Sequence, residues 1–234
     1  MSFAVIIPSA GTGSRSGREI PKQYVKILGM PVLAHTIRAF SGFPGCAEII
    51  IPIDERWRDL AVQCAAGIDI VRFVSGGDTR GASIANGLAA IGAGVDLVMV
   101  HDAARPCVSR DLIARVLEAG VLHGAAIPAL PINETVKLVD DEGIILETIP
   151  RSSLRTAQTP QCFRRDLLER AYAHAASHGI IATDDASLVE ELGEKVWVVE
   201  GKWENLKITL PIDFDRAERG LMAILDQPRD SSAS

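Results

Sequence analysis

Short apolar runs alternate along the chain with stretches in which apolar residues recur at helical spacing. The apolar runs predict strands at residues 3–7, 47–53, 70–74, 95–100 and 125–130. The helical spacing predicts helices near residues 31–40, 55–66, 80–92 and 109–122. Because strands separated by helices form parallel βαβ units, the pattern predicts an α/β fold with a single doubly wound, mostly parallel sheet.

The alternation of strand and helix stops after residue 130. Two strand-like runs at residues 135–139 and 144–148 flank an acidic turn, Asp140-Asp141-Glu142-Gly143, which is typical of a β-hairpin. A two-stranded hairpin is marginally stable alone in water, so it needs a surface to pack on. We predict a projecting arm at about residues 132–153 that packs on a second subunit, the alternative being a hairpin folded back on its own domain.

The remainder of the chain returns to the earlier pattern. It predicts helices at residues 164–177 and 184–192, strands at 195–199 and 206–209, a final helix from about 212 to 225, and a polar tail. No internal repeat or flexible linker interrupts it. We therefore expect residues 1–234 to form one domain that carries the arm.

Composition narrows the functional class. The chain has 234 residues, of which 47% are apolar and 23% charged, as in ordinary globular proteins. Its net charge of −6 argues against binding nucleic acid, so an anionic substrate must be met by a local basic cluster. No apolar run is long enough to span a membrane, and no secretory leader is visible. The four scattered cysteines indicate free thiols in a cytoplasmic protein.

A glycine-rich turn follows the first strand, within the segment PSAGTGSRSGREIPKQY at residues 8–24. Such a turn exposes backbone N–H groups at the carboxyl end of a strand, and glycines let a ligand approach the backbone closely. Two cations, Arg15 and Lys22, follow within a few residues, and Pro21 restricts the chain before Lys22. Together these features predict a polyphosphate site, which includes the turn residues Ala10, Gly11, Thr12 and Gly13.

Better-known glycine loops do not match this turn. Lys22 lies too far from Gly11 for a Walker-type loop, and Ser16 stands where the dinucleotide fingerprint has its third glycine. The glycines alone also fit a turn that merely joins a strand to a helix.

Two further segments follow predicted strands. Asp102, after the strand at 95–100, suits a divalent metal or a substrate hydroxyl, although an Asp there can also cap the next helix. Arg105 is as compatible with the surface as with the site. Gly77, Asp78 and Ser83 offer donors and acceptors that suit a base edge, although Asp78 or Thr79 fits a simple helix cap equally well.

Later residues give weaker signals. Thr159 and Thr183 offer loop hydroxyls to a polar substrate, although Thr183 also fits a helix start. Arg151 follows the hairpin, and Lys207 lies in the apolar run at 206–209, where a lysine either enters a cleft or stays in solvent.

Several segments in fixed order make the chain similar to the 2-C-methyl-D-erythritol 4-phosphate cytidylyltransferase family over about residues 3–225. They are PSAGTGSRSG with PKQY, GGDTRGASIANGL, VHDAARP, RTAQTPQ, TDDAS and ENLKIT. The resemblance implies a Rossmann-like nucleotidyltransferase of the non-mevalonate isoprenoid pathway. Such an enzyme joins CTP and methylerythritol phosphate, with Mg²⁺, to give the CDP-alcohol and pyrophosphate.

The resemblance also implies roles for the site residues. Arg15 and Lys22 would stabilise charge at the α-phosphate, and the glycine turn would hold CTP. The segment at 77–83 would bind cytosine, and Asp102 would lie beside the ribose or the metal.

On the acceptor side, the resemblance assigns Arg151 and Lys207 to methylerythritol phosphate. Thr135 and Arg151 would reach the partner's active site in a homodimer. The chain departs from the family pattern at Ser9, Ser16 and Glu134, where Ala, Met and Asp are usual.

Other functional classes stay open on the sequence. A ribitol 5-phosphate cytidylyltransferase would share the lysine and Thr-Pro-Gln motifs. An NAD(P)-dependent oxidoreductase could use Asp54 for the ribose, but Ser16 spoils its glycine fingerprint. A catalytically inactive nucleotide-binding module is a third possibility, against which the intact set of cations argues.

Overall fold

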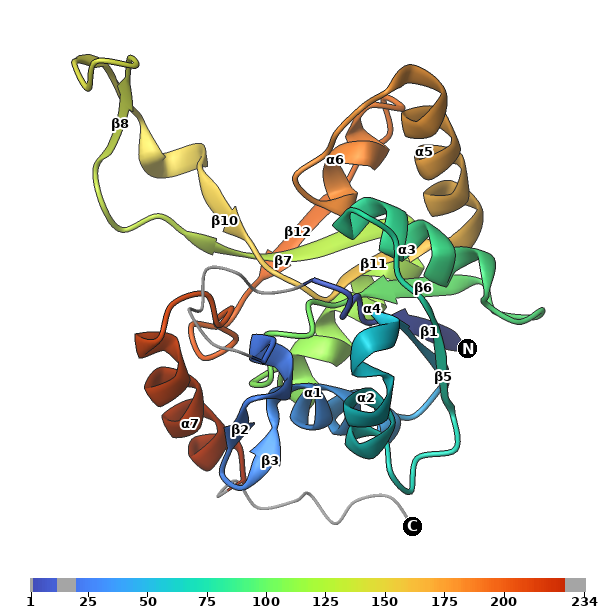
Figure 1. Ribbon diagram of the computed structural model, residues 1–234. Helices are drawn as coiled ribbons and strands as arrows, with labels where there is room; N and C mark the ends of the chain where they lie inside the picture. The colour runs from blue at the N-terminus through green and yellow to red at the C-terminus, as the bar shows by residue number, and fades with distance from the viewer. Residues whose placement is uncertain (1, 12–19, 226–234) are drawn as a thin grey trace.

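The computed structural model describes residues 2–11 and 20–225 and contains one large sheet (Figure 1). Its strands are hydrogen-bonded in the order β7-β11-β6-β1-β4-β5. β10 pairs with β7 on the same edge as β11, and β12 pairs with the opposite edge of β7. The strands are β1 (Phe3–Ile6), β4 (Cys46–Ile53), β5 (Val71–Ser75), β6 (Leu97–Val100), β7 (Ala125–Pro131), β10 (Arg155–Ala157), β11 (Gln161–Arg164) and β12 (Trp197–Glu200). The pairs β5–β4, β4–β1, β1–β6 and β7–β12 are parallel, so the predicted mostly parallel sheet is confirmed.

Helices cover both faces of this sheet. One face packs against α1 (Val32–Ser41), α2 (Arg58–Cys64) and α4 (Arg110–His123); the other packs against α3 (Arg80–Ala89), α5 (Arg165–His178) and α6 (Asp185–Glu190). Successive side chains of a strand point to opposite faces. Accordingly Phe3 and Val5 of β1 join the first core, and Ala4 and Ile6 join the second. The doubly wound architecture follows from this burial of both faces.

A smaller apolar cluster joins the last helix to the sheet. It packs α7 (Ile212–Leu225) against Ile27 of β2 (Lys26–Ile27), which pairs with β3 (Met30–Pro31), and against Ile208. The expected strand at residues 206–209 is wrong. That segment joins no ladder, because its Ile208 N–H donates instead to the carbonyl of Ala104, in the loop after β6, at 2.9 Å.

The sequence analysis missed two antiparallel strands, β10 and β11. Both lie along one edge of β7, because Ala129 pairs with β10 and Ala126 with β11 while both alanines also pair with β12 on the opposite edge. The break between them, at residues 158–160, contains the cis peptide bond Thr159–Pro160. These short strands have no alternation of their own to reveal them, and the fold places β11 between β6 and β7.

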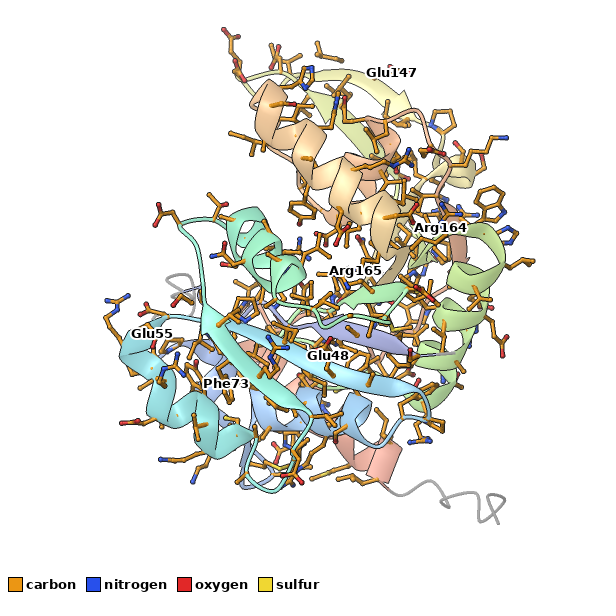
Figure 2. All side chains as sticks on the ribbon, turned by 90° about the vertical axis from the view of Figure 1, so that its right-hand side faces the viewer. Glu48, Glu55, Phe73, Glu147, Arg164 and Arg165 are labelled. Carbon is orange, nitrogen blue, oxygen red and sulfur yellow. The ribbon has the colours of Figure 1, made fainter. Side chains whose placement is uncertain are left out.

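The predicted hairpin is present as β8 (Val136–Val139) and β9 (Ile145–Ile149). It projects from the body of the molecule (Figure 1), and Figure 2 shows Glu147 of β9 far from Phe73 of β5. Its turn is closed by Asp140, whose carboxylate accepts hydrogen bonds from the N–H groups of Glu142 and Ile144. Five large apolar side chains of the hairpin are exposed. They are Leu138, Val139, Ile144, Ile145 and Leu146.

Within the described part of the chain, three short 3₁₀ helices complete the fold: η2 (Lys22–Tyr24), η3 (Glu55–Trp57) and η4 (Arg151–Ser153). Among the helices that the structure describes, none is both long and apolar enough to cross a membrane. All four cysteines are free thiols, as expected.

Candidate active site at the carboxyl ends of the strands

A cavity of about 370 Å³ lies where β1, β5 and β6 end. This is the position at which the strand order reverses on either side of β1, and ligands of doubly wound sheets bind at such a point. The cavity brings together eight of the thirteen predicted site residues that the structure describes. They are Ala10, Gly11, Lys22, Gly77, Asp78, Ser83, Asp102 and Lys207. Thr12, Gly13 and Arg15, as well as Ser16, lie outside the described residues.

The cavity's first wall is the segment after β1. The Gln23 amide donates hydrogen bonds to the carbonyls of Ser9 and Gly11, at 2.8 and 3.0 Å, and so fixes the turn. Lys22 opens η2 directly after Pro21, and its Nζ donates to the Ile208 carbonyl at 2.6 Å. The sequence motif Pro-Lys-Gln therefore has two functions here, since Gln23 shapes the turn and Lys22 presents a cation to the cavity.

The second wall is the segment between β5 and α3. A Cβ atom added to Gly76 would lie 2.2 Å from the Ala10 Cβ, so a glycine is needed for the two walls to meet. Thr79 takes the N-cap of α3 and accepts from the Ala82 N–H at 3.0 Å. Because Thr79 serves as the cap, the exposed carboxylate of Asp78 is left for a ligand.

The carboxylate of Asp102, just after β6, forms ion pairs with three basic side chains. Its Oδ2 lies 3.1 Å from Lys207 Nζ and 3.2 Å from Arg105 Nε, and its Oδ1 lies 3.4 Å from Arg80 Nε. Burial by itself would raise the pKa of Asp102, but Lys207, Arg80 and Arg105 outweigh it and hold the pKa well below its usual range. The carboxylate is therefore ionised at neutral pH and concentrates positive charge at the cavity.

Arg80 is a cavity residue that the sequence analysis did not select. Its Nη2 donates to the carboxylate of Asp185 at 2.9 Å, and the Tyr172 hydroxyl donates to the same carboxylate at 2.6 Å. Burial works against the charged form of Arg80, but Asp185 and Asp102 raise its pKa above the ordinary value. No local signal marks this pair, since Arg80 and Asp185 are 105 positions apart.

The carboxylates at the cavity do not form a resident metal centre. Across residues 2–11 and 20–225, no group of three or more His, Cys, Asp or Glu side chains could hold a metal ion. Asp102, the expected ligand, already has three cationic partners, and its charge is compensated. Mg²⁺ prefers several oxygen donors in octahedral arrangement, which these side chains do not supply.

A buried layer beneath the cavity fixes Asp102. Thr159 is 4% exposed, and its hydroxyl accepts a hydrogen bond from the Asp102 N–H at 3.0 Å. Arg105 is also buried, and its Nη1 donates to the Asn205 carbonyl at 2.8 Å. Neither Thr159 nor Arg105 lines the cavity, although both were expected to contact substrate.

The same layer fixes the charge state of His101. Its Nε2 lies 3.1 Å from the Arg105 carbonyl, which can only accept, so this nitrogen carries the proton. The Nδ1 atom, 3.1 Å from the Thr159 hydroxyl, is then the acceptor in a neutral ring. Burial lowers the pKa of His101 to about 4, so the neutral ring persists well below pH 7.

Acid should therefore destabilise the fold through His101. The unfolded chain binds a proton to this ring near pH 6.5, whereas the folded chain does so only near pH 4, so stability falls as the pH is lowered between these values. At pH 5 we expect about 2 kcal/mol of the stability at pH 7.5 to be lost through this residue.

Urea unfolding at both pH values measures this effect. His101→Gln should lose that much less stability on acidification than the wild type, whereas the exposed His178→Gln should behave as the wild type. Equal losses in the wild type and His101→Gln would contradict the assignment.

Three further predicted residues also lie outside the cavity lining. Thr183 is exposed just before α6 and does not cap it, because Asp184 accepts from the Ser187 N–H at 3.1 Å. Thr135 and Arg151 are exposed at the base of the hairpin, where Arg151 donates to the Asn133 carbonyl. A single copy of the chain thus leaves the arm's cation away from the cavity that Lys22 and Lys207 line.

Comparison with known proteins gives a consistent match. A family model described as 2-C-methyl-D-erythritol 4-phosphate cytidylyltransferase matches residues 3–223. A curated protein of that name from Acidobacterium capsulatum is 43% identical over 229 residues, covering 93% of this chain and 96% of the relative. Another from Desulforamulus reducens is 39% identical over 221 residues, covering 93% and 94%.

Solved structures agree with these relatives. The 4-diphosphocytidyl-2C-methyl-D-erythritol synthase from Anaerococcus prevotii superposes with a TM-score of 0.85 at 31% identity, covering 94% of this chain and 98% of the other. A 2-C-methyl-D-erythritol 4-phosphate cytidylyltransferase from Thermus thermophilus gives 0.80 at 38% identity, covering 95% and 100%.

Proposed function

The chain belongs to the 2-C-methyl-D-erythritol 4-phosphate cytidylyltransferase family, and from this premise we propose how its cavity performs the reaction. The protein is a nucleotidyltransferase that joins CTP and 2-C-methyl-D-erythritol 4-phosphate in the non-mevalonate route to isoprenoid precursors. The products are 4-diphosphocytidyl-2-C-methyl-D-erythritol and pyrophosphate. The observation that carries this function is the gathering of Lys22, Arg80 and Lys207 on one cavity beside a glycine turn.

The reaction forms one bond to phosphorus and breaks another. An ionised phosphate oxygen of methylerythritol phosphate attacks the α-phosphorus of CTP, and the bond from that phosphorus to the bridging oxygen breaks as pyrophosphate leaves. The nucleophile is already ionised, so no strong base is needed, and the neutral, buried His101 is not used as one. Positioning and charge stabilisation carry the rate.

Each wall of the cavity has a separate task in this proposal. The turn at residues 10–13 holds the triphosphate, with Arg15 and Lys22 stabilising the charge that develops at the α-phosphate. Gly77, Asp78 and Ser83 bind the cytosine. Asp102 lies beside the ribose. Arg105 acts by pairing with the Asp102 carboxylate, and Thr159 acts by accepting a hydrogen bond from the Asp102 backbone N–H.

Lys207 and Arg151 meet the acceptor phosphate from opposite sides in this proposal. Lys207 is already at the cavity, and Thr183 lies exposed on a loop before α6. Arg151 and Thr135 arrive on the arm of a second subunit, because the exposed apolar side chains of the hairpin need a surface to cover them. The functional unit is then a homodimer of single-domain subunits.

Mg²⁺ belongs to the proposal as an ion that enters with CTP. The triphosphate supplies the oxygen donors that Mg²⁺ prefers, and the ion would neutralise phosphate charge there. Asp102 would join its coordination only by releasing a cation, of which Lys207 is the most exposed at 42%. We place the reaction in the cytoplasm, where the four free thiols would stay reduced.

Pyrophosphate release from CTP and Mg²⁺ tests the function, with methylerythritol phosphate and ribitol 5-phosphate as separate acceptors. Release with methylerythritol phosphate alone is expected. Release with ribitol 5-phosphate alone would support cytidylyl transfer but contradict the proposed acceptor. Release with neither acceptor would contradict the proposed reaction.

Mixing two inactive variants tests whether the sites are shared between subunits. Lys22→Ala and Arg151→Ala homodimers should each be impaired. If Arg151 reaches the partner's cavity, one site of each mixed dimer has both residues intact. An equimolar, re-equilibrated mixture should then recover about a quarter of the wild-type sites.

Steady-state rates at saturating CTP, before and after mixing, measure this recovery. Arg155→Ala, also at the base of the arm, is the matched control. It should be active alone, and its mixture with Lys22→Ala should stay at the sum of the two components whether or not the sites are shared. A mixture of Lys22→Ala with Arg151→Ala that stays at the sum of its components would contradict the shared site.

A further inference from the structure

One wall of the cavity rests on a fully buried carboxylate, that of Asp185 in the first turn of α6. Its exposed fraction is 0%. A buried carboxylate is costly unless it is paired and hydrogen-bonded. Here both oxygens have partners, since Oδ2 accepts from Arg80 Nη2 at 2.9 Å and Oδ1 accepts from the Tyr172 hydroxyl at 2.6 Å.

The start of α6 does not need this carboxylate for its own stability. Asp184 caps the helix through the Ser187 N–H, and Gln161 of β11 ties it to the sheet. The Gln161 amide donates to Asp184 Oδ2 at 2.8 Å and accepts from the Ala186 N–H at 3.1 Å. Asp185 is thus held in place by contacts other than the one that it makes with Arg80.

Arg80 is the residue that gains from the pair. Its guanidinium reaches from the first turn of α3 to two carboxylates, Asp185 at 2.9 Å and Asp102 at 3.4 Å. The shorter contact is the one to Asp185, and the side chain remains 31% exposed on the cavity wall. A planar guanidinium held along one edge presents its remaining N–H groups in a fixed direction.

We propose that Asp185, together with Tyr172, is a positioning residue that fixes the Arg80 guanidinium on the cavity wall that receives the cytidine half of CTP. This inference rests on the proposed function. Arg80 lines the cavity next to Gly77 and Asp78, so the group that it would contact is the nucleoside and not the acceptor phosphate. Loss of Asp185 leaves Arg80 with Asp102 as its one carboxylate partner among the described residues and frees the guanidinium to change direction.

A double-mutant cycle on CTP affinity tests the proposal. Asp185→Asn should raise the KM for CTP and its calorimetric Kd about 10-fold, with a smaller change in kcat. Because Asp185 acts through Arg80, Asp185→Asn should have no further effect in an Arg80→Ala background. Asp184→Asn, which keeps a good capping residue at the neighbouring position, should leave the CTP affinity unchanged.

Tyr172→Phe is the milder second variant, because it removes one hydroxyl and keeps the Asp185–Arg80 pair. We expect it to raise the KM and Kd for CTP about threefold. If Asp185→Asn does not fold, Tyr172→Phe decides: weaker CTP binding supports the proposal, and wild-type affinity overturns it.

Two results overturn the proposal for a folded Asp185→Asn variant. One is wild-type affinity for CTP. The other is a double variant, Asp185→Asn with Arg80→Ala, whose Kd for CTP rises by the product of the two single-variant factors. Failure of the proposed function is separate from both, because it would appear as a wild-type protein that releases no pyrophosphate. Even if no pyrophosphate is released, the calorimetric Kd for CTP can still be compared between the wild type and the Asp185→Asn variant to test the positioning role.

Discussion

Replacing Lys22 by alanine is expected to lower kcat by about 10²- to 10³-fold, the loss typical of one preorganised charge donor to a transition state. Lys22 opens η2 behind Pro21, lines the cavity and has its Nζ held 2.6 Å from the Ile208 carbonyl. An ammonium already fixed in direction costs little reorganisation when charge develops at the α-phosphate. The KM values should change less than kcat, since the stabilised charge grows in the transition state.

Steady-state kinetics with both substrates measure this effect. Lys26→Ala is the matched control, because it removes the same charge from an exposed position four residues along the chain and should keep wild-type rates. A Lys22→Ala variant with near-normal kcat would show that this lysine does not stabilise the reacting phosphate.

Replacing Asp102 by asparagine should cost about 3–5 kcal/mol of unfolding free energy, because it leaves buried cations without their counter-charge. Asp102 is the common partner of Arg80, Arg105 and Lys207, and its side chain is 10% exposed. Its folded-state pKa is depressed below the unfolded value. The carboxylate's contribution is therefore complete above about pH 4 and is lost only as the pH falls below that. At pH 7 the full difference between the two proteins should appear.

Urea unfolding at pH 7 measures the loss, and CTP binding should weaken with it because Arg80 and Lys207 lose their shared anchor. Asp111→Asn is the control. That carboxylate also has two basic partners, Arg115 and Lys202, but it is 52% exposed, so its removal should cost at most about 1 kcal/mol. Equal losses for Asp102→Asn and Asp111→Asn would show that the buried cluster does not depend on its central carboxylate.

Local patterns predicted most of the main sheet and much of the cavity. The apolar runs before Pro8 and His101 are buried parallel strands. Asp102 comes just after the second run, and Lys22 lies in the segment that follows the first. Their meeting at one edge follows from a general property of parallel sheets, that the carboxyl ends of the strands lie together. The hairpin could also be predicted from the local sequence, because Asp140 and Gly143 mark its turn.

The misses share a different cause. Residues 206–209 are apolar enough for a strand, but they cross the loop after β6 instead of joining a ladder. β10 and β11 are defined by the strand that they lie against, since β7 supplies the partners for both. Short segments such as these take their conformation from tertiary neighbours and not from their own periodicity.

The sequence by itself determined the alternation of strands and helices up to β7, the turn motifs and the placement of Asp102 at the end of a strand, because each depends on residues within a few positions of one another. Only the tertiary structure decided that Arg80 would bridge Asp102 and Asp185, that Thr159 would lie buried beneath Asp102, and that His101 would be neutral. Those properties arise from charges and hydrogen bonds between groups far apart in the chain. Their strength depends on distance and burial, which no local pattern records.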